Sequence, residues 1–380
     1  MKISRRNFLA VAGAAAAAAA LTACGGSSAS STSTASSAAG STASSVAEGG
    51  EKIVKVALTC DTGTIDDESF NQACWTAVSG YMGADCQYYI PEADASDEDR
   101  ETMIRLAVNE GADVIVCVGY LYGASLAWAA DQYPNVKFIA VDVTQGDIGT
   151  DTIPANCYCI TFKEEQAGYL AGYAIAKDGK TKLGFLGGMA VPAVIRYGYG
   201  FVQGADAAAK ELGVDDVNIK YWYSGGFAAT DEVKNKMDGW YSEGTEVVFA
   251  CGGPVCESCD AAAQANGGKM IGVDVDQSGR YDTVITSAMK GLAESVNEAL
   301  TDSMNNGWKF TETYAGKETK LGAAENCVGL PMETSKFNKF TKEQYDAMYA
   351  SIVDGTLTID DSFDTTVTPS VTNVTVDYQG

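Results

Sequence analysis

Histidine is absent from the 380 residues of this chain. Its absence excludes histidine-based catalytic triads, histidine general bases and imidazole metal sites. Basic residues are also few, since 26 Lys and Arg stand against 50 Asp and Glu, which gives a formal net charge of −24. A surface of this charge repels nucleic acid and anionic lipid headgroups. We therefore expect no nucleic-acid partner and a small ligand that is neutral or cationic.

Long hydrophobic runs are missing as well, because no stretch beyond residue 23 approaches the roughly 20 apolar residues of a membrane-spanning helix. The N-terminal run over residues 8–21 is alanine-rich and follows Lys2, Arg5 and Arg6. This pattern predicts a signal peptide over residues 1–23, with a short membrane-anchor helix as the alternative. The letters SRRNFL at residues 4–9 resemble a twin-arginine export motif. The letters LTAC at residues 21–24 resemble a bacterial lipobox, in which Cys24 is acylated.

Residues 24–50 are almost entirely Ser, Ala, Thr and Gly. Such a segment buries too little apolar surface to offset the entropy lost on ordering, so we predict a flexible linker. A lipid on Cys24 would then hold the protein at the extracytoplasmic face of the cell membrane. Residues 51–380 are enough for two lobes.

Ten cysteines remain besides Cys24, without the regular spacing of a small disulfide-rich protein. Several lie in apolar runs, where a free cysteine behaves as a small hydrophobic residue. Cys251, Cys256 and Cys259 could suggest a thiolate metal site, but no fourth ligand follows at a matching spacing. We therefore predict reduced structural thiols, no metal and no cofactor.

The body of the chain repeats a strand–helix rhythm. Short apolar runs begin near residues 53, 86, 114 and 136, and again near residues 183, 219, 247 and 270. Each interval has room for one helix, as parallel strands require. We predict an α/β fold with two doubly wound, Rossmann-like lobes. The N-terminal lobe would take residues 51–160 and about 284–325, and the C-terminal lobe residues 161–283 and about 326–380.

The predicted strands end on glycine or aspartate in both halves of the chain. The positions that share this property are Asp61, Gly119, Asp142, Gly187, Gly188, Gly225, Gly226, Gly252, Gly253 and Asp274. In open α/β sheets, ligands bind beyond the carboxyl ends of the strands. Ordinary strand–helix turns use the same residue types. The recurrence in two matched halves favours a ligand cleft between the lobes.

Five motifs occur in order along the chain. They are DTGTIDDESFN at residues 61–71, FKEEQAGYLAG at 162–172, GGM at 187–189 followed by Pro192 and the pairs GF and GA at 200–205, GVDVDQ at 272–277, and TSAMK at 286–290. Together they resemble the basic membrane protein family, the purine nucleoside-binding lipoproteins of ABC importers. The resemblance covers about residues 52–306, and an ordered set of five motifs is far more specific than a lone glycine pattern.

The resemblance implies a type I periplasmic-binding-protein fold whose lobes close on a nucleoside. Carried over by motif, Asp61 and Asn71 would hydrogen-bond the base, and Phe70 would stack on it. Phe227 would stack on the opposite face from the second lobe. Asp274 would take the ribose hydroxyls, with Lys290 nearby. The remaining residues expected at the site are Tyr122, Gly188, Met189 and Gly253.

Several of these residues have plausible structural roles instead. Phe70 could belong to the core, Asp274 could cap the following segment, and Lys290 could form a structural ion pair. The acids at 66–67 and at 164–165 are interpreted as helix starts, the second pair as solvated. Gly168 and Gly172 are expected to permit close helix packing. The loop at 119–125 departs from the family pattern, because it lacks an acidic residue near position 124 and offers tyrosine and serine hydroxyls.

We therefore predict a lipid-anchored, monomeric binding protein that delivers nucleosides, with purines preferred, to an ABC permease and its ATPase. The alternatives are a protein of the same fold that binds a sugar or another small polar ligand, and a sensor subunit. A surface nucleoside hydrolase is disfavoured by the missing histidines and by the lack of a compact aspartate cluster. The prediction is that the chain is not an enzyme.

Overall fold

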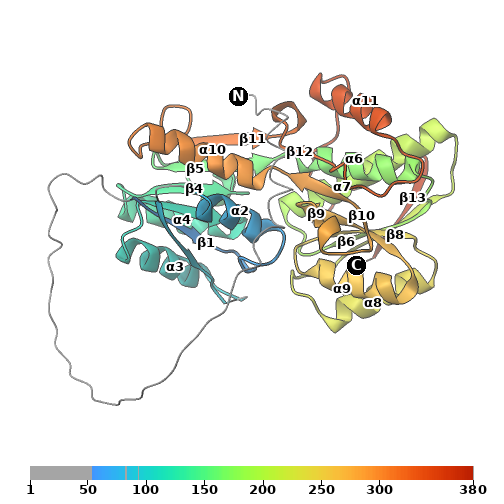
Figure 1. The fold of residues 1–380 in the computed structure, drawn as a ribbon, viewed down its shortest axis with the longest axis horizontal. Coiled ribbons are helices and arrows are strands. Elements are labelled where there is room, and N and C mark those ends of the chain that lie inside the picture. The colour runs from blue at the N-terminus through green and yellow to red at the C-terminus, as the bar shows by residue number, and fades with distance from the viewer. Residues whose placement is uncertain (1–53, 82–83, 93, 380) are drawn as a thin grey trace, which may run out of the picture.

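The computed structural model describes residues 54–81, 84–92 and 94–379. The predicted signal peptide, the lipidated Cys24 and the linker lie outside the described residues. Within them, the chain forms two α/β lobes that lie side by side, each built on one sheet (Figure 1). No helix in this part of the chain combines the length and the apolar character needed to cross a bilayer.

The first lobe contains a six-stranded parallel sheet in the order β11-β5-β4-β3-β1-β2. Its strands are β1 (Val54–Thr59), β2 (Ala84–Tyr89), β3 (Val114–Val118), β4 (Lys137–Val141), β5 (Cys157–Phe162) and β11 (Lys317–Leu321). Its helices are α2 (Phe70–Ser79), α3 (Asp97–Asn109), α4 (Gly123–Gln132), α5 (Gln145–Ile148) and α10 (Leu292–Asn305).

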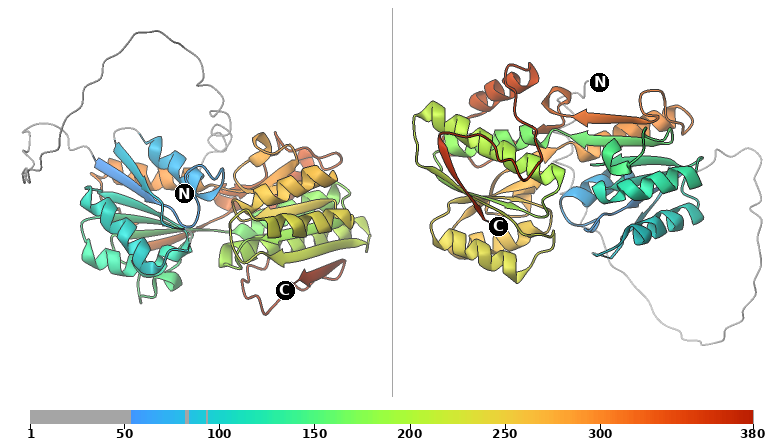
Figure 2. Two further views of the ribbon diagram at one scale, coloured as in Figure 1. Left: turned by 90° about the horizontal axis from the view of Figure 1, so that it is seen from below. Right: turned by 180° about the vertical axis from the view of Figure 1, so that it is seen from behind.

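The second lobe repeats this plan in a seven-stranded sheet of order β12-β10-β9-β8-β6-β7-β13. Its strands are β6 (Lys182–Gly187), β7 (Val217–Tyr223), β8 (Val247–Cys251), β9 (Lys269–Asp274), β10 (Val284–Lys290), β12 (Val328–Gly329) and β13 (Val374–Gln379). Its helices are α6 (Glu164–Lys177), α7 (Pro192–Leu212), α8 (Asp231–Ser242), α9 (Val255–Asn266) and α11 (Lys342–Val353). Only the short β12 runs antiparallel to its neighbour among the described strands. Helices cover both faces of each sheet (Figure 2), so the predicted doubly wound fold with two matched lobes is confirmed.

Local sequence signals explain where the helices begin and end. Ser96 caps α3 in a capping box with Asp99. Pro192 occupies the first turn of α7, and Gly213 ends that helix in the left-handed conformation with φ 66°. A Cβ added at Gly172 would lie 2.0 Å from the backbone oxygen of Phe201. The predicted close packing of α6 on α7 therefore depends on glycine.

The chain crosses between the lobes three times: after β5, after β10, and between β11 and β12. The predicted boundary near residue 284 is too early, because β10 pairs with β9 and belongs to the second sheet. The apolar runs in the sequence predicted four strands in each half of the chain, and β10 is a fifth strand of the second lobe. The helix that follows, α10, packs on the first lobe through Leu292 and Val296. The crossover therefore falls just after Lys290.

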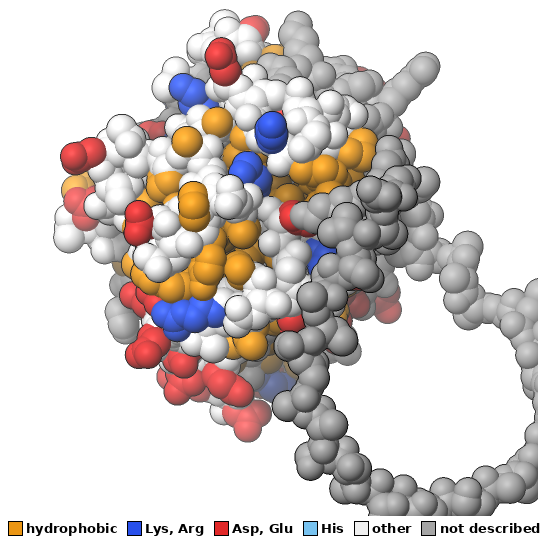
Figure 3. Space-filling view, turned by 90° about the vertical axis from the view of Figure 1, so that its left-hand side faces the viewer, with side chains coloured by type: hydrophobic (Ala, Val, Ile, Leu, Met, Phe, Trp, Pro, Cys, Tyr) orange, Lys and Arg blue, Asp and Glu red, His pale blue; other side chains and the backbone are white. Residues whose placement is uncertain are grey.

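The described cysteines are all free, and all except Cys86 are buried. Among the described residues, no group of Cys, Asp or Glu side chains is arranged to hold a metal ion. The space-filling view of the end of the first lobe shows acidic side chains gathered along its lower edge, around hydrophobic and uncharged side chains (Figure 3). This distribution agrees with the large negative charge of the sequence.

Candidate ligand-binding cleft

A cavity of about 880 Å³, a volume that includes space open to solvent, lies between the two lobes. Its walls come from the carboxyl ends of the strands of both sheets and from the crossover region, where the sequence predicts a cleft. Of the ten predicted site residues, seven line it: Asp61, Phe70, Asn71, Phe227, Gly253, Asp274 and Lys290.

The polar wall of the first lobe is the segment between β1 and α2. The Asp61 carboxylate accepts hydrogen bonds from the Gly63 N–H at 3.1 Å and from the Asn71 side-chain amide at 2.9 Å. Burial raises the pKa of Asp61, and the hydrogen bonds from Asn71 and Gly63 oppose that rise. Gly119 permits this arrangement, because a Cβ there would lie 2.9 Å from the Cβ of Asp61. Asp61 and Asn71 thus form one fixed donor–acceptor pair.

Asp67 organises the start of α2 beside that pair. Its carboxylate accepts the backbone N–H groups of Ser69, Asn71 and Gln72 at 2.9–3.1 Å. It also accepts the side-chain amide of Asn71 at 2.8 Å. The interpretation of Asp67 as a helix-start acid is confirmed, and the same residue lines the cavity.

Two phenylalanines face the cavity from opposite lobes. Phe70 is the first residue of α2, and Phe227 lies in the loop after β7. Gly188 supports Phe227 from behind, since a Cβ at Gly188 would lie 2.3 Å from the Phe227 ring. The predicted placement of Gly188 and Met189 at the ligand site needs correction, because neither residue lines the cavity.

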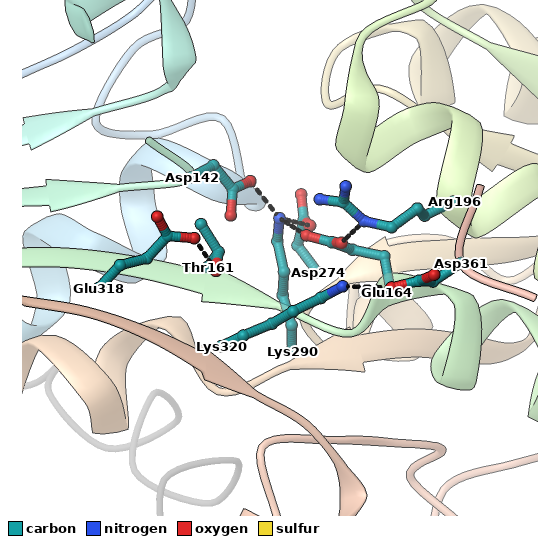
Figure 4. Close-up of polar contacts among 9 residues, drawn as sticks. All are labelled: Asp142, Thr161, Glu164, Arg196, Asp274, Lys290, Glu318, Lys320 and Asp361. Atoms are coloured by element: carbon teal, nitrogen blue, oxygen red, sulfur yellow. Dashed lines mark hydrogen bonds and ion pairs between the residues drawn. The ribbon is translucent and has the colours of Figure 1, made fainter. Parts of the chain in front are cut away.

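Lys290 is at the centre of a buried charge cluster (Figure 4). Its Nζ lies 2.5 Å from Asp142 Oδ2, 3.6 Å from Glu164 Oε1 and 3.8 Å from Asp274 Oδ1. It also lies 4.8 Å from the ring centroid of Phe70. Lys290 therefore lines the cavity and forms ion pairs, so the two interpretations of this residue do not exclude each other.

The charge states in this cluster follow from burial and from the neighbouring ions. Burial alone would lower the pKa of Lys290, but Asp142, Asp274 and Glu164 raise it above its ordinary value. Burial raises the pKa of Asp142 to about 6, against the opposing effect of Lys290. Burial also raises the pKa of Asp274, with Lys290 and Ser69 opposing it. The ammonium is thus held charged by three carboxylates in a buried site.

Asp142 and Asp274 occupy equivalent places in the two lobes, at the ends of β4 and β9. Both have left-handed backbone conformations, with φ 56° at Asp142 and φ 67° at Asp274. Aspartate tolerates this region better than most residues, and strained residues of this kind concentrate at functional sites. Asp142 was recognised from the sequence as a strand end but was not placed in the predicted site.

Contacts across the cleft hold the lobes together in this structure. Ser69 of the first lobe donates to Asp274 Oδ2 of the second lobe at 2.6 Å. The Gln277 side-chain amide donates to the backbone oxygen of Glu68 at 3.1 Å, and Arg280 lies 3.4 Å from the Glu68 carboxylate. The rim of the cleft is therefore bridged on this side.

Glu164 and Glu165 begin a helix as predicted, but the prediction that they are solvated is wrong, because both side chains are buried. They begin α6 where the chain crosses between the lobes, and α7 covers this turn. Arg196 Nε donates to Glu164 Oε2 at 2.7 Å. Burial alone would raise the pKa of Glu164, but Arg196 and Lys290 lower it below its ordinary value. Burial and the charge of Glu164 raise the pKa of Glu165 to about 7.

Tyr122 is the third predicted site residue that needs correction, because its side chain is 0% exposed and lies in the core of the first lobe. Its hydroxyl donates to the backbone oxygen of Cys60 at 2.8 Å. Tyr120 lines the cavity instead. The two tyrosines lie in one 3-10 turn, Tyr120–Tyr122, so neighbouring side chains point in different directions.

Sequence reasoning also missed Arg196 and Tyr197, which line the cavity from the start of α7. The third motif lies in part in this helix, but the sequence of the motif does not indicate whether its arginine is buried or exposed. For Asp142 a signal was available, since it follows the fourth strand of its lobe just as Asp274 ends the fourth strand of the other.

Comparisons with known proteins agree with this geometry. A family model described as ABC transporter substrate-binding protein PnrA-like matches residues 53–362. A model of the twin-arginine translocation signal matches residues 2–22. Basic membrane protein A of Borreliella burgdorferi is 29% identical over 309 residues, covering 80% of this chain and 87% of that protein. The ABC transporter nucleoside-binding protein BmpA of Lactococcus lactis is 27% identical over 332 residues, covering 80% and 89%.

Solved structures share the fold at lower sequence identity. A solute-binding protein of an ABC transporter system from Aeropyrum pernix superposes with a TM-score of 0.70 at 21% identity, covering 82% of this chain and 95% of that chain. A second, from Conexibacter woesei, gives a TM-score of 0.64 at 21% identity, covering 81% and 99%. At this identity the likeness concerns the fold alone.

Proposed function

Because the chain belongs to the family of PnrA-like ABC transporter substrate-binding proteins, we propose that it captures a nucleoside, preferably a purine nucleoside, for an importer. The importer would consist of a permease and its ATPase. The binding protein would work as a monomer on the extracytoplasmic face, held there by a lipid on Cys24.

One observation carries the proposal: Phe70 and Phe227 line the same cavity from opposite lobes. Two rings on either side of a gap suit a flat base, and each stacking contact contributes roughly 1–3 kcal/mol. Asp61 and Asn71, fixed against each other, offer a carboxylate and an amide to the polar edge of the base. Carboxylate oxygens of Asp274 suit the two hydroxyl donors of a ribose, at about 1.5–3 kcal/mol for each charge-assisted bond.

The relatives give further support, since one of them is named as a nucleoside-binding protein. The acidic lining supports an uncharged ligand. Asp61, Asp67, Asp142, Asp147 and Asp274 all line the cavity, and together they would repel a phosphate.

The test is to identify small molecules released when the purified protein is denatured, and then to titrate ligand-free protein by calorimetry. The panel should hold inosine, guanosine, adenosine, pyrimidine nucleosides, ribose and galactose. We expect saturable one-to-one binding of a purine nucleoside. Binding of a sugar alone would favour the alternative ligand class, and no binding across the panel would refute the nucleoside proposal.

Matched variants make the titration specific for the site. Phe70→Ala should weaken nucleoside binding, because it removes one of the two stacking faces. Tyr88→Ala is the control, since Tyr88 is an exposed aromatic residue of β2 that does not line the cavity. Equal affinities for both variants would contradict stacking of the ligand between Phe70 and Phe227.

The membrane anchor needs its own experiment. Cys24→Ser should abolish labelling of the protein by a radioactive fatty acid and release it from the membrane fraction. Labelling that persists in this variant would contradict lipidation at Cys24.

A further inference from the structure

Arg196 is a buried cation with donor groups that no described residue uses. It lies in α7, its side chain is 8% exposed, and it lines the cavity. Its Nε donates to Glu164 Oε2 at 2.7 Å. Its two terminal nitrogens form no hydrogen bond or ion pair with the described residues. Figure 4 shows these nitrogens turned away from Glu164, on the side where Asp274 and Lys290 gather.

Two neighbours fix the guanidinium group in this position. Glu164 holds its Nε edge, and the ring centroid of Phe363 lies 5.7 Å from its Cζ. Phe363 belongs to the segment before β13, and Asp361 of the same segment pairs with Lys320 of β11 at 2.7 Å. A planar guanidinium held at one edge and one face loses little freedom when it binds a ligand through its remaining edge.

Lys290 cannot supply the same donors. Three carboxylates surround its ammonium group at 2.5, 3.6 and 3.8 Å, whereas Arg196 has one. Arg196 is the one other cation among the described residues that line the cavity. Glu164 balances its charge, so the free edge suits a neutral oxygen better than a phosphate surrounded by aspartates.

We propose that Arg196 determines ligand specificity by donating hydrogen bonds from its terminal N–H groups to the 5′-oxygen of the nucleoside. The inference rests on the proposed function. The 2′- and 3′-hydroxyls are donors that match the carboxylates of Asp274 and Asp142, which leaves the 5′-oxygen as the acceptor for the arginine. Glu164 and Phe363 act on the ligand through Arg196 and are positioning residues.

The test measures the affinity of the wild type and of Arg196→Met for a bound nucleoside, its 5′-deoxy analogue and its 2′-deoxy analogue. The wild type should bind the 5′-deoxy analogue roughly 10- to 100-fold more weakly than the parent nucleoside. Arg196→Met should bind the parent nucleoside and its 5′-deoxy analogue equally well. It should still bind the parent nucleoside more tightly than the 2′-deoxy analogue. Arg105→Met, which changes a partly exposed arginine of α3 outside the cavity, should keep the wild-type ratio.

The outcomes separate this inference from the proposed function. A wild type that binds no nucleoside refutes the proposed function. A wild type that binds the nucleoside and its 5′-deoxy analogue equally overturns the role of Arg196, whether or not any variant folds. A 5′ preference that persists in Arg196→Met overturns it as well.

The positioning role of Phe363 has a separate readout. Phe363→Ala should reduce the ratio between the two affinities, and Phe363→Trp should restore it, because an indole ring also stacks on guanidinium. A loss of thermal stability with an unchanged ratio would show that Phe363 has a structural role only.

Discussion

Replacement of Lys290 by methionine removes the one ammonium group that three buried carboxylates share. At an effective dielectric constant of 20, each carboxylate near 4 Å attracts the ammonium by about 4 kcal/mol. The three carboxylates lie 2.5, 3.6 and 3.8 Å from the ammonium, so each is within this distance of 4 Å. Desolvation offsets much of this attraction, and removal of one partner from a buried pair costs about 3–5 kcal/mol. We expect a loss of this size in the free energy of unfolding near pH 8.

The loss should shrink as the pH falls. Burial already holds the pKa of Asp142 at about 6 and raises the pKa of Asp274. Without the ammonium, both values rise further. A carboxyl group with a folded-state pKa above its unfolded value of about 3.9 stabilises the fold below that value, and this contribution is lost as the pH rises through the folded pKa. The variant should therefore approach the wild type near pH 4.5, where its carboxyl groups take up protons.

Urea unfolding of both proteins at pH 4.5 and pH 8 measures this difference. Lys320→Met is the control, because its pair with Asp361 is partly exposed and should contribute about 1 kcal/mol or less at either pH. An equal loss at both pH values would refute the electrostatic explanation. No loss at pH 8 would show that burial of the three carboxylates does not require Lys290 for the stability of the fold.

Three further substitutions test separate parts of the structure. Phe227→Ala should weaken nucleoside binding by about 1–3 kcal/mol in calorimetry, through loss of one stacking face, and unchanged affinity would remove Phe227 from the site. Tyr122→Phe should lower the free energy of unfolding by about 1 kcal/mol through loss of one buried hydrogen bond, with ligand affinity unchanged, and weaker binding would reinstate the prediction made from the sequence. Gly172→Ala should lower the melting temperature, because its Cβ would lie 2.0 Å from the Phe201 oxygen and overpacking costs about 1–3 kcal/mol. Gly239→Ala in α8, with nothing within 4 Å, should not lower it, and equal effects would contradict the packing argument.

The fold could be predicted from the sequence because its signals are local and repeated. The eight strands predicted from apolar runs begin within two residues of those observed. Glycine and aspartate at the strand ends indicated the cleft, since parallel strands bring those ends to one edge of each sheet. The fifth strand of the second lobe, β10, escaped because its role depends on pairing with β9 rather than on its own letters.

The residues that were missed or misplaced depend on contacts between distant segments. Two adjacent glutamates at a helix start normally lie in water, but here the crossover between the lobes buries Glu164 and Glu165. Glu164 meets Arg196 from a helix 32 residues further along the chain. Tyr120 and Tyr122 differ by two positions, and only the 3-10 turn decides which ring faces the cavity. A sequence pattern carries none of this information.

The repeat of the two lobes explains why the cleft keeps an excess of negative charge. Asp142 follows directly after β4 and Asp274 ends the equivalent strand β9, so the fold brings two aspartates to the meeting point of the lobes. The fifth strands break this equivalence, because β5 ends in Phe162 and β10 ends in Lys290, each two residues before the next helix. The side chains at these two equivalent positions lie close together, since Lys290 Nζ is 5.4 Å from the centroid of the Phe162 ring. Lys290 and Arg196 bring two positive charges against the three carboxylates of Asp142, Asp274 and Glu164, so one negative charge is left over, which suits a ligand that brings hydroxyl donors.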